Sequence, residues 1–433
     1  MTTTIAGEAT RAARRRLPLV GLLAAQLISR AGNAITMIAV PLYVLGTTHS
    51  PLATGIAGVF ATLPVVIGGS LGGVLVDRFG YRISSIAADL ASGVTVLAIP
   101  VLALTVGLPF WGLVLLVFLS GLLDTPGDTA KAVIVPELAA LARTPLSRAA
   151  GAQAAIERTA SMVGAAVAGA LVALVGPLSV LFVDAASFLA CAVLVAVTVP
   201  RRLPASAAAP AVEPSAGGYW AGLAAGLRFV WRSRLLRGVI LLVTMTNAID
   251  AAGMTVLKPV YATATGDPAL LGLIVGCFAV GALTGSILFA GVGRRWSGRG
   301  MFVACFFLAG VPPYAAMALA VPVPALLVVL ALSGLAAGAL NPMIATVMYG
   351  LVPDGMRARV FGVTSAGATA AMPLGAFLAG ITVAAFGLHA VLIGCAVLYG
   401  CLTVAPLFDR AFLGLAAARD DVPSDEERVT MAA

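Results

Sequence analysis

The sequence predicts an all-α membrane protein with twelve transmembrane helices, arranged as two parallel six-helix repeats with both termini in the cytoplasm. An extreme composition, long apolar runs and an internal repeat predict this fold. Hydrophobic residues make up 61% of the chain and charged residues 10%, whereas a soluble domain is about half apolar and a quarter charged. Because so few charged side chains could not cover a water-facing surface, the bilayer must solvate most of the chain.

The apolar runs have the length of membrane-spanning helices, which need about 20 residues. They lie at 18–45, 52–75, 83–105, 109–130, 149–173, 178–199, 236–262, 268–291, 300–320, 323–348, 360–385 and 389–408. Long continuous runs favour helices over the short alternating segments of a β-barrel. The first run follows a basic segment, as a signal peptide does, but it reaches Leu45 without a clear cleavage site. We therefore expect it to be retained as helix 1.

The loops between these runs alternate in charge. Basic residues occupy the loops near 11–16, 78–82, 131–148, 201–237, 294–299, 357–359 and 410. The other loops, near 46–51, 106–108, 174–177, 263–267, 321–324 and 386–389, contain no Lys or Arg. The positive-inside rule places the basic loops in the cytoplasm, and both termini with them. Because the basic residues are scattered over short turns, the net charge of +8 is no sign of nucleic-acid binding.

The two halves of the chain match at a nearly fixed offset. An offset of 217 positions pairs Pro51 with Pro268, Gly55 with Gly272, Gly68 with Gly285, Arg78 with Arg295, Arg82 with Arg299, Gly121 with Gly338, Asp124 with Asn341, Pro136 with Pro353, and Glu137 with Asp354. Beyond a shorter loop the offset is 211, as for Gly164 and Gly375. Six runs separate the copies, so both halves have the same orientation. Parallel repeats of this kind form transporters whose substrate site lies between the halves.

Composition divides the chain into five segments. We expect a basic cytoplasmic N-terminus at 1–16, an N-terminal six-helix bundle at 17–200, a cytoplasmic linker at 201–235, a C-terminal six-helix bundle at 236–410 and an acidic disordered tail at 411–433. The Ala- and Pro-rich start of the linker indicates mobility, and its second part predicts an amphipathic helix on the inner leaflet.

Enzyme chemistry is not indicated anywhere in the chain. The only two lysines are Lys131 and Lys258, and neither follows a glycine, so no phosphate-binding P-loop is present. The five cysteines lie in apolar runs without C-x-x-C spacing, and the sequence has neither a metal-binding cluster nor a hydrolase G-x-S-x-G motif. We expect a secondary transporter with no cofactor, no metal and no nucleic-acid partner. Parallel repeats form a cavity within one chain, so we expect a monomer.

Polar residues inside the apolar runs are the candidates for transport, because a charge at the bilayer centre costs about 2.5–3.5 kcal/mol on insertion scales. Arg30 and Asn33 lie three residues apart near the middle of the first run. Asn247 and Asp250 have a similar depth and spacing in the seventh run. We expect both pairs to line a cavity, although a polar clamp between helices is the alternative.

A second group of candidates lies in the fourth and fifth runs. Asp124 lies in the fourth run, and the consecutive residues Glu157 and Arg158 lie at a matching depth in the fifth. An Asp124–Arg158 ion pair is therefore plausible. A carboxylate whose cationic partner comes and goes can take up and release a proton. A static buried pair is the alternative. Asn341 holds the position that matches Asp124 but cannot titrate.

One segment resembles a family signature. Gly73-Val-Leu-Val-Asp77-Arg78-Phe-Gly80-Tyr81-Arg82 resembles the loop 2–3 motif of the major facilitator superfamily, with Tyr81 in place of one basic residue. Residues 184–188, 271–285 and 357–362 are similar to the branch that contains macrolide-efflux proteins and the enterobactin exporter. The resemblance covers roughly 17–410. The Gly-Pro-x-x-Gly-Gly motif of drug antiporters is replaced by Gly-Ala-Ala-Val-Ala-Gly at 164–169, which weakens the support for antiport.

The resemblance implies which helices and residues do the work. Helices 1, 4, 7 and 10 would line the cavity, and Asp77, Arg78 and Arg82 would form a cytoplasmic gate between the halves. We add Asp89 to this gate because it could meet Arg78 or Arg82.

Three further polar residues are given other roles. Asp128 and Lys131 continue the Asp124 face toward the cytoplasmic end, where we expect them to be interfacial. Asp184 lies on an outer helix, where a packing role is expected.

The resemblance also supplies a direction and a substrate class. It implies a proton-coupled exporter of amphipathic small molecules, such as drugs, macrolides or siderophore-like compounds, that works by alternating access in a bacterial inner membrane. An importer or uniporter of the same fold is one alternative. A membrane sensor or lipid-handling protein is another, although the chain has no long structured loop to support it.

Overall fold

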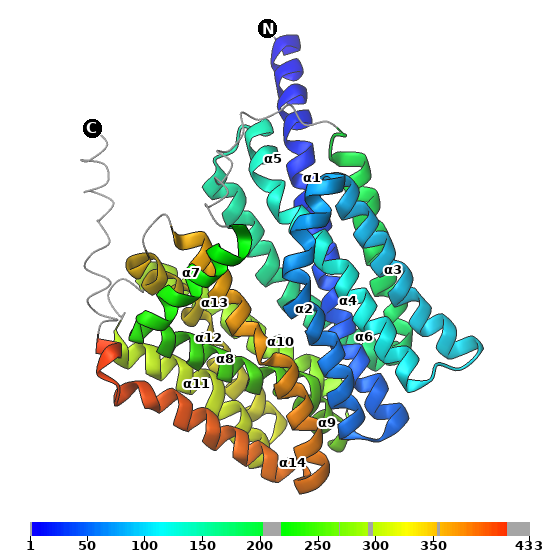
Figure 1. Ribbon diagram of the computed structural model, residues 1–433. Coiled ribbons are helices and arrows are strands. Elements are labelled where there is room, and N and C mark those ends of the chain that lie inside the picture. Colours follow the sequence, from blue (N-terminus) through cyan, green and yellow to red (C-terminus); the bar gives the residue numbers. More distant parts are fainter. Residues whose placement is uncertain (1, 202–217, 268, 293–297, 353–355, 414–433) are drawn as a thin grey trace. The chain divides into compact units, whose positions relative to one another are not determined.

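The computed structural model describes residues 2–201, 218–267, 269–292, 298–352 and 356–413, and every element within these ranges is a helix (Figure 1). The α-helices are α1 (Thr2–Thr48), α2 (Pro51–Phe79), α3 (Tyr81–Thr105), α4 (Phe110–Val133), α5 (Val135–Leu141), α6 (Leu146–Thr198), α7 (Gly218–Arg232), α8 (Arg234–Ala252), α9 (Lys258–Ala264), α10 (Ala269–Val292), α11 (Arg299–Ala318), α12 (Val323–Leu351), α13 (Arg357–Ala370) and α14 (Met372–Val404). A π-helix, η1 (Gly253–Leu257), joins α8 to α9, and two short 3₁₀ turns, η3 (Ala405–Leu407) and η4 (Arg410–Leu413), follow α14.

Within the described ranges, nine helices are long and apolar enough to cross a membrane, and 51–67 is a shorter apolar helix. Part of the difference from the twelve expected spans arises because Val360–Leu407 is one span that covers two expected runs. Gly176 in α6 and Gly387 in α14 have φ angles of 83° and 79°, a left-handed conformation that glycine adopts without steric cost. Each of these two elements therefore consists of two helical segments that meet at a turn, where the sequence predicts a loop. The number of spans and the side on which the termini lie remain predictions.

The chain forms two compact units. The first comprises Met1–Ala209, Met254–Gly276 and Ala379–Ile381, and the second comprises Pro210–Gly253, Cys277–Leu378 and Thr382–Ala433. The division after Ala209 falls within the expected linker. A second division after Gly253 falls inside the seventh expected span, at the start of the π-helix.

In the first unit, α1 packs along α6, and α4 packs against both α2 and α3 (Figure 1). A cluster of buried apolar side chains from α1, α5 and α6, including Leu22, Leu138 and Val195, joins these helices at one end. Small residues allow helix backbones to approach closely in a membrane. At Gly164 on α6, for example, an added Cβ would collide with the backbone of Ala31 on α1. The core of this unit is therefore built around the contact between α1 and α6.

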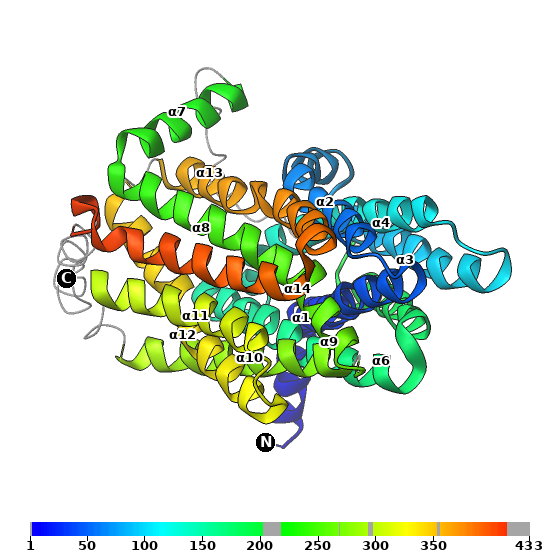
Figure 2. The ribbon, with the colours of Figure 1, turned by 90° about the horizontal axis from the view of Figure 1, so that it is seen from below.

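In the second unit, α8 lies beside α13, and α7 lies against both (Figure 2). The helices α10 and α12 carry facing small-residue motifs, Gly281-x-x-x-Gly285 and Gly334-x-x-x-Gly338. An added Cβ at any of these four glycines would collide with the backbone of the other helix. This motif permits tight helix packing where lipid provides no hydrophobic driving force.

Helix α7 supplies the amphipathic segment that the linker predicts. Val230 is buried in an apolar cluster with residues of α8, α12 and α13, whereas Leu227 and Trp231 are exposed. The Arg237 guanidinium lies 5.8 Å from the centre of the Trp231 ring. One face of α7 thus packs on the second unit, while the other turns an aromatic ring outward.

Candidate functional site

The polar residues of α1 and α4 meet in two adjacent contacts within the first unit. The Asn33 Nδ2 atom donates a hydrogen bond of 2.8 Å to Asp124 Oδ2. The Arg30 Nη2 atom lies 3.5 Å from Asp128 Oδ2, and each of these two side chains is 31% exposed. Residues three or four positions apart share a helix face. The two contacts therefore follow each other along one face of α1 and one face of α4.

Asp124 is left with an unused acceptor. Its Oδ1 atom is buried and has no hydrogen-bond partner among the residues described. Asp128 lies close enough for its negative charge to act on Asp124. A buried polar atom without a partner is costly, and a neighbouring like charge adds to the cost. The arrangement favours the arrival of a proton or of a hydrogen-bond donor at this oxygen.

The expected partner of Asp124 cannot be compared with the structure. The backbone of Glu157 and Arg158 belongs to α6, but their side chains lie outside the described part of the chain. The Asp124–Arg158 ion pair therefore remains a prediction. In the structure, the Asn33 amide is the partner of Asp124. The sequence places Asn33 in the first run but does not pair it with Asp124.

Asp89 pairs with Lys131 and not with Arg82, and its other expected partner, Arg78, has its side chain outside the described part of the chain. The Lys131 Nζ atom lies 2.6 Å from Asp89 Oδ1, and both side chains are 0% exposed. The Cys191 thiol completes the site by donating to Asp89 Oδ2 over 3.1 Å. A buried carboxylate requires a compensating charge, and the flexible lysine stem allows the ammonium group to turn inward and supply it. The three residues join α3, α4 and α6.

Arg82 instead binds the end of α6. Its Nε atom donates to the Val199 carbonyl over 2.9 Å, and its Nη2 atom donates to the Ala196 carbonyl over 2.6 Å. The last carbonyl groups of a helix lack partners within the helix, and a basic side chain can satisfy them. The other two expected gate residues, Asp77 and Arg78, lie on α2 with side chains outside the described part.

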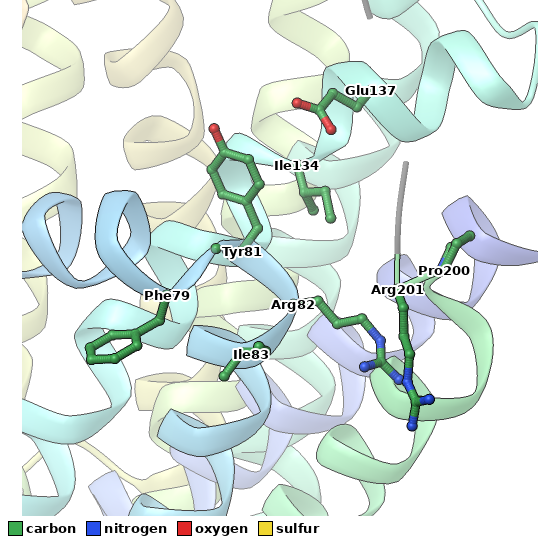
Figure 3. A pocket seen from close by; sticks show the side chains of 9 residues that line it. Phe79, Tyr81, Arg82, Ile83, Ile134, Glu137, Pro200 and Arg201 are labelled. Atoms are coloured by element: carbon green, nitrogen blue, oxygen red, sulfur yellow. The ribbon is translucent and has the colours of Figure 1, made fainter. Parts of the chain in front are cut away.

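A pocket of about 250 Å³ opens beside Arg82 (Figure 3). It is lined by Phe79, Gly80, Tyr81, Arg82, Ile83, Ile134, Glu137, Pro200 and Arg201. These residues come from the turn between α2 and α3, from α4 and α5, and from the end of α6. The pocket thus lies at one end of the first unit, and the polar contacts of Asp124 do not contribute to it.

Asp184 has the packing surroundings expected of it. The buried carboxylate accepts hydrogen bonds from the Thr36 hydroxyl on α1 and, over 3.1 Å, from the Ser187 hydroxyl one turn further along α6. An added Cβ at Gly32 would collide with Asp184 and Ser187. The glycine therefore lets α1 approach the carboxylate, which ties the two helices together.

In the second unit, the expected pathway residues are held by different partners. The Asn247 Nδ2 atom donates a hydrogen bond of 2.8 Å to the Ala368 carbonyl on α13. Asp250 is exposed and interacts with the hydroxyl groups of Tyr314 on α11 and Tyr399 on α14. Asn341 is exposed on α12. Sequence reasoning missed both tyrosines, because no spacing connects them with Asp250; the only signal is a polar ring in each of two otherwise apolar runs.

The residues that the structure describes contain no group of three or more His, Cys, Asp or Glu side chains that could hold a metal ion. The polar side chains instead form pairs and short hydrogen-bonded contacts between helices. Such contacts can bind a small molecule or a proton.

Comparison with known proteins identifies the family and several transporter relatives. Residues 17–429 match the family described as transmembrane secretion effectors. The chain is 34% identical over 379 residues to the multidrug efflux pump Tap of Mycolicibacterium fortuitum, which covers 87% of this chain and 91% of that protein. It is 32% identical over 380 residues to the multidrug efflux pump Tap of Mycobacterium tuberculosis strain H37Rv. This alignment covers 87% of this chain and 89% of that protein.

Solved structures share the fold at low sequence identity. The nucleoside transporter NupG superposes with a TM-score of 0.70 at 14% identity, over 90% of this chain and 98% of that one. The D-xylose-proton symporter superposes with a TM-score of 0.65 at 18% identity, over 93% and 98% of the two chains. The chain is a multi-pass inner-membrane transporter, not an enzyme, and it belongs to the transmembrane secretion effector family of the major facilitator superfamily.

Proposed function

We propose that this transporter is a proton-coupled exporter of amphipathic small molecules that works by alternating access. The names of its relatives support drug efflux. The observation that carries the proton coupling is the buried Oδ1 atom of Asp124, which has no hydrogen-bond partner among the described residues. A carboxylate inside a membrane-spanning helix is costly and is a default candidate for an ion or proton pathway.

Asp124 is the proposed coupling residue. In its ionised form Asp124 accepts the Asn33 hydrogen bond, but burial without a second partner among the described residues opposes that form. Proton uptake relieves this opposition, and a change of exposure during the cycle would release the proton on the other side of the membrane. The Asn33 amide can keep its contact in both states because a protonated carboxyl group still accepts a hydrogen bond through its carbonyl oxygen.

The remaining assignments complete the proposal. Arg30, Asn33, Glu157, Arg158, Asn247, Asp250 and Asn341 line the substrate and proton pathway with Asp124. The cytoplasmic gate consists of Asp77, Arg78 and Arg82, with Asp89 behind them in its ion pair with Lys131. The transporter has twelve spans, cytoplasmic termini and a monomeric state, and α7 lies on the inner leaflet.

The test is efflux of lipophilic dyes and antibiotics from a pump-deficient bacterium, with and without a protonophore, for the native protein and Asp124→Asn. The substitution keeps the shape but removes the titrating group. Asp267→Asn is the matched control, because Asp267 is exposed outside the spans.

We expect protonophore-sensitive efflux that Asp124→Asn abolishes and Asp267→Asn retains. Full efflux by Asp124→Asn would move the coupling to another residue, such as Glu157 or Asp250. Efflux that is unchanged by the protonophore would contradict proton coupling.

Two alternative functions are distinguished in proteoliposomes. An importer would accumulate the substrate in response to an inward proton gradient, and a uniporter would equilibrate it without any gradient. A protein that senses or handles lipids would move none of the compounds across the membrane.

A further inference from the structure

The pocket at the end of the first unit is lined by two arginines, Arg82 and Arg201. In Figure 3 both arginine side chains extend away from Glu137, which lines the same pocket. Neither arginine forms an ion pair with a carboxylate among the described residues. Two positive charges that line one pocket repel each other, and a bound anion offsets this repulsion. The pair is therefore incomplete without a negatively charged group.

Arg82 is fixed in the orientation that such a group requires. Its Nε and Nη2 atoms are bound to the Val199 and Ala196 carbonyls at 2.9 and 2.6 Å. These two contacts leave the Nη1 hydrogens and one Nη2 hydrogen for another acceptor. Arg201 follows directly after the end of α6 and is exposed. A guanidinium held by two carbonyl groups and an exposed one in the same pocket are well suited to a phosphate group, which arginine binds through parallel hydrogen bonds.

The helices that carry the pair also expose apolar stripes. On α3, Ile83, Leu90 and Val94 are 61, 44 and 67% exposed and lie at helical spacing. On α6, Leu189, Val193 and Val197 are 56, 52 and 78% exposed at intervals of four residues.

The two stripes begin at the arginines. Ile83 follows Arg82 directly, and Val197 lies between the two carbonyl groups that Arg82 binds. The helices α3 and α6 pack against each other. An amphipathic molecule with an anionic head and long apolar chains would match both the arginine pair and the stripes.

We propose that Arg82 and Arg201 form a binding site for the phosphate of an anionic glycerophospholipid, whose acyl chains lie along the exposed stripes of α3 and α6. The charges of Arg82, Arg201 and Glu137 give the pocket a net charge of one positive unit. A lipid with one net negative charge balances it. The apolar stripes select a membrane lipid over a free phosphate, because a soluble anion cannot use them.

The experiment measures phosphatidylglycerol bound to the purified, detergent-solubilised transporter by native mass spectrometry, with phosphatidylcholine as the zwitterionic comparison. The principal variant is Arg201→Gln, because Arg201 is exposed and its loss should not affect folding. Arg82→Gln is the second variant, although it also removes the cap of α6. Arg148→Gln is the matched control, since Arg148 is an exposed arginine in the first turn of α6.

We expect Arg201→Gln to weaken phosphatidylglycerol binding about fivefold, and Arg148→Gln to leave it unchanged. Phosphatidylcholine should bind more weakly to the native protein and should not respond to Arg201→Gln. Equal retention of phosphatidylglycerol by the native protein and Arg201→Gln would overturn the proposal. Displacement of the lipid by an equal concentration of soluble glycerol phosphate would show that the acyl stripes play no part, which would also overturn it.

Discussion

The two units contain repeats of one sequence pattern, yet they differ in how they fill the same interior positions. In the first unit, Asp89 and Lys131 form an ion pair with no exposed surface. The offset of 217 residues maps these positions onto Phe306 and Met348, which are 3 and 5% exposed in apolar clusters of the second unit. One repeat thus folds with a buried charge pair where the other folds with apolar side chains. The helix arrangement itself does not require the charges.

The candidate pathway residues show a second difference. The same offset maps Asn33 onto Asp250 and Asp124 onto Asn341, so the amide and the carboxylate exchange places between the repeats. In the first unit Asn33 donates directly to Asp124, whereas in the second unit Asp250 turns to the tyrosines of α11 and α14. The two candidate carboxylates, Asp124 in the first repeat and Asp250 in the second, are therefore contacted by different kinds of side chain. We infer that the repeats have divided the work, with the titrating role on the first unit and a separate contact on the second.

The largest expected difference between the two units concerns the buried Asp89–Lys131 ion pair. Lys131→Met leaves Asp89 as an uncompensated buried charge, and we expect a loss of about 3–5 kcal/mol in the free energy of unfolding. The double variant Asp89→Leu with Lys131→Met imitates the second unit and should recover most of this loss. Thermal unfolding in detergent, followed by circular dichroism, measures both. Arg148→Met controls for the loss of an exposed cation. A double variant as unstable as Lys131→Met would show that the first unit depends on the charges.

Helix packing gives the next largest contrast. At Gly338 on α12 an added Cβ would meet the backbone of Ala282 and Ser286, whereas at the matching Gly121 on α4 it would lie 3.1 Å from the Pro64 side chain. Backbone atoms cannot move aside as readily, so Gly338→Ala should cost about 1–3 kcal/mol. Gly121→Ala should cost less, because alanine also favours the helix by about 1 kcal/mol over glycine. The same unfolding assay compares them, and an equal loss in both variants would contradict the difference in packing.

The smallest contrast concerns the two asparagines. Asn33→Ala removes a hydrogen bond to a carboxylate and should cost about 1.5 kcal/mol, whereas Asn247→Ala removes one to the Ala368 carbonyl and should cost about 0.6 kcal/mol. If Asp124 carries the proton, only Asn33→Ala should also shift the pH dependence of efflux. A shift of similar size in Asn247→Ala would argue against the division of work between the units.

Prediction from the sequence succeeded where a property depends on residues close together in the chain. The apolar runs indicated the helices, since about 20 consecutive apolar residues can satisfy their backbone in lipid only as a helix. The shared face of Arg30 and Asn33 also follows from local spacing. Neither the partner of Asp89 nor that of Asp250 was found, because each partner lies on a helix far away in the sequence.

The sequence by itself determined that the chain is a helical membrane protein, that it repeats, and which polar residues lie inside the apolar runs, because composition and helical period act locally. The tertiary structure alone decided how those residues combine. It turned Lys131 inward to Asp89, brought the Asn33 amide to Asp124 and placed Arg82 on the end of α6. The physical reason is that the rotation and depth of one helix against another set these contacts, and those depend on packing along the whole length of both helices.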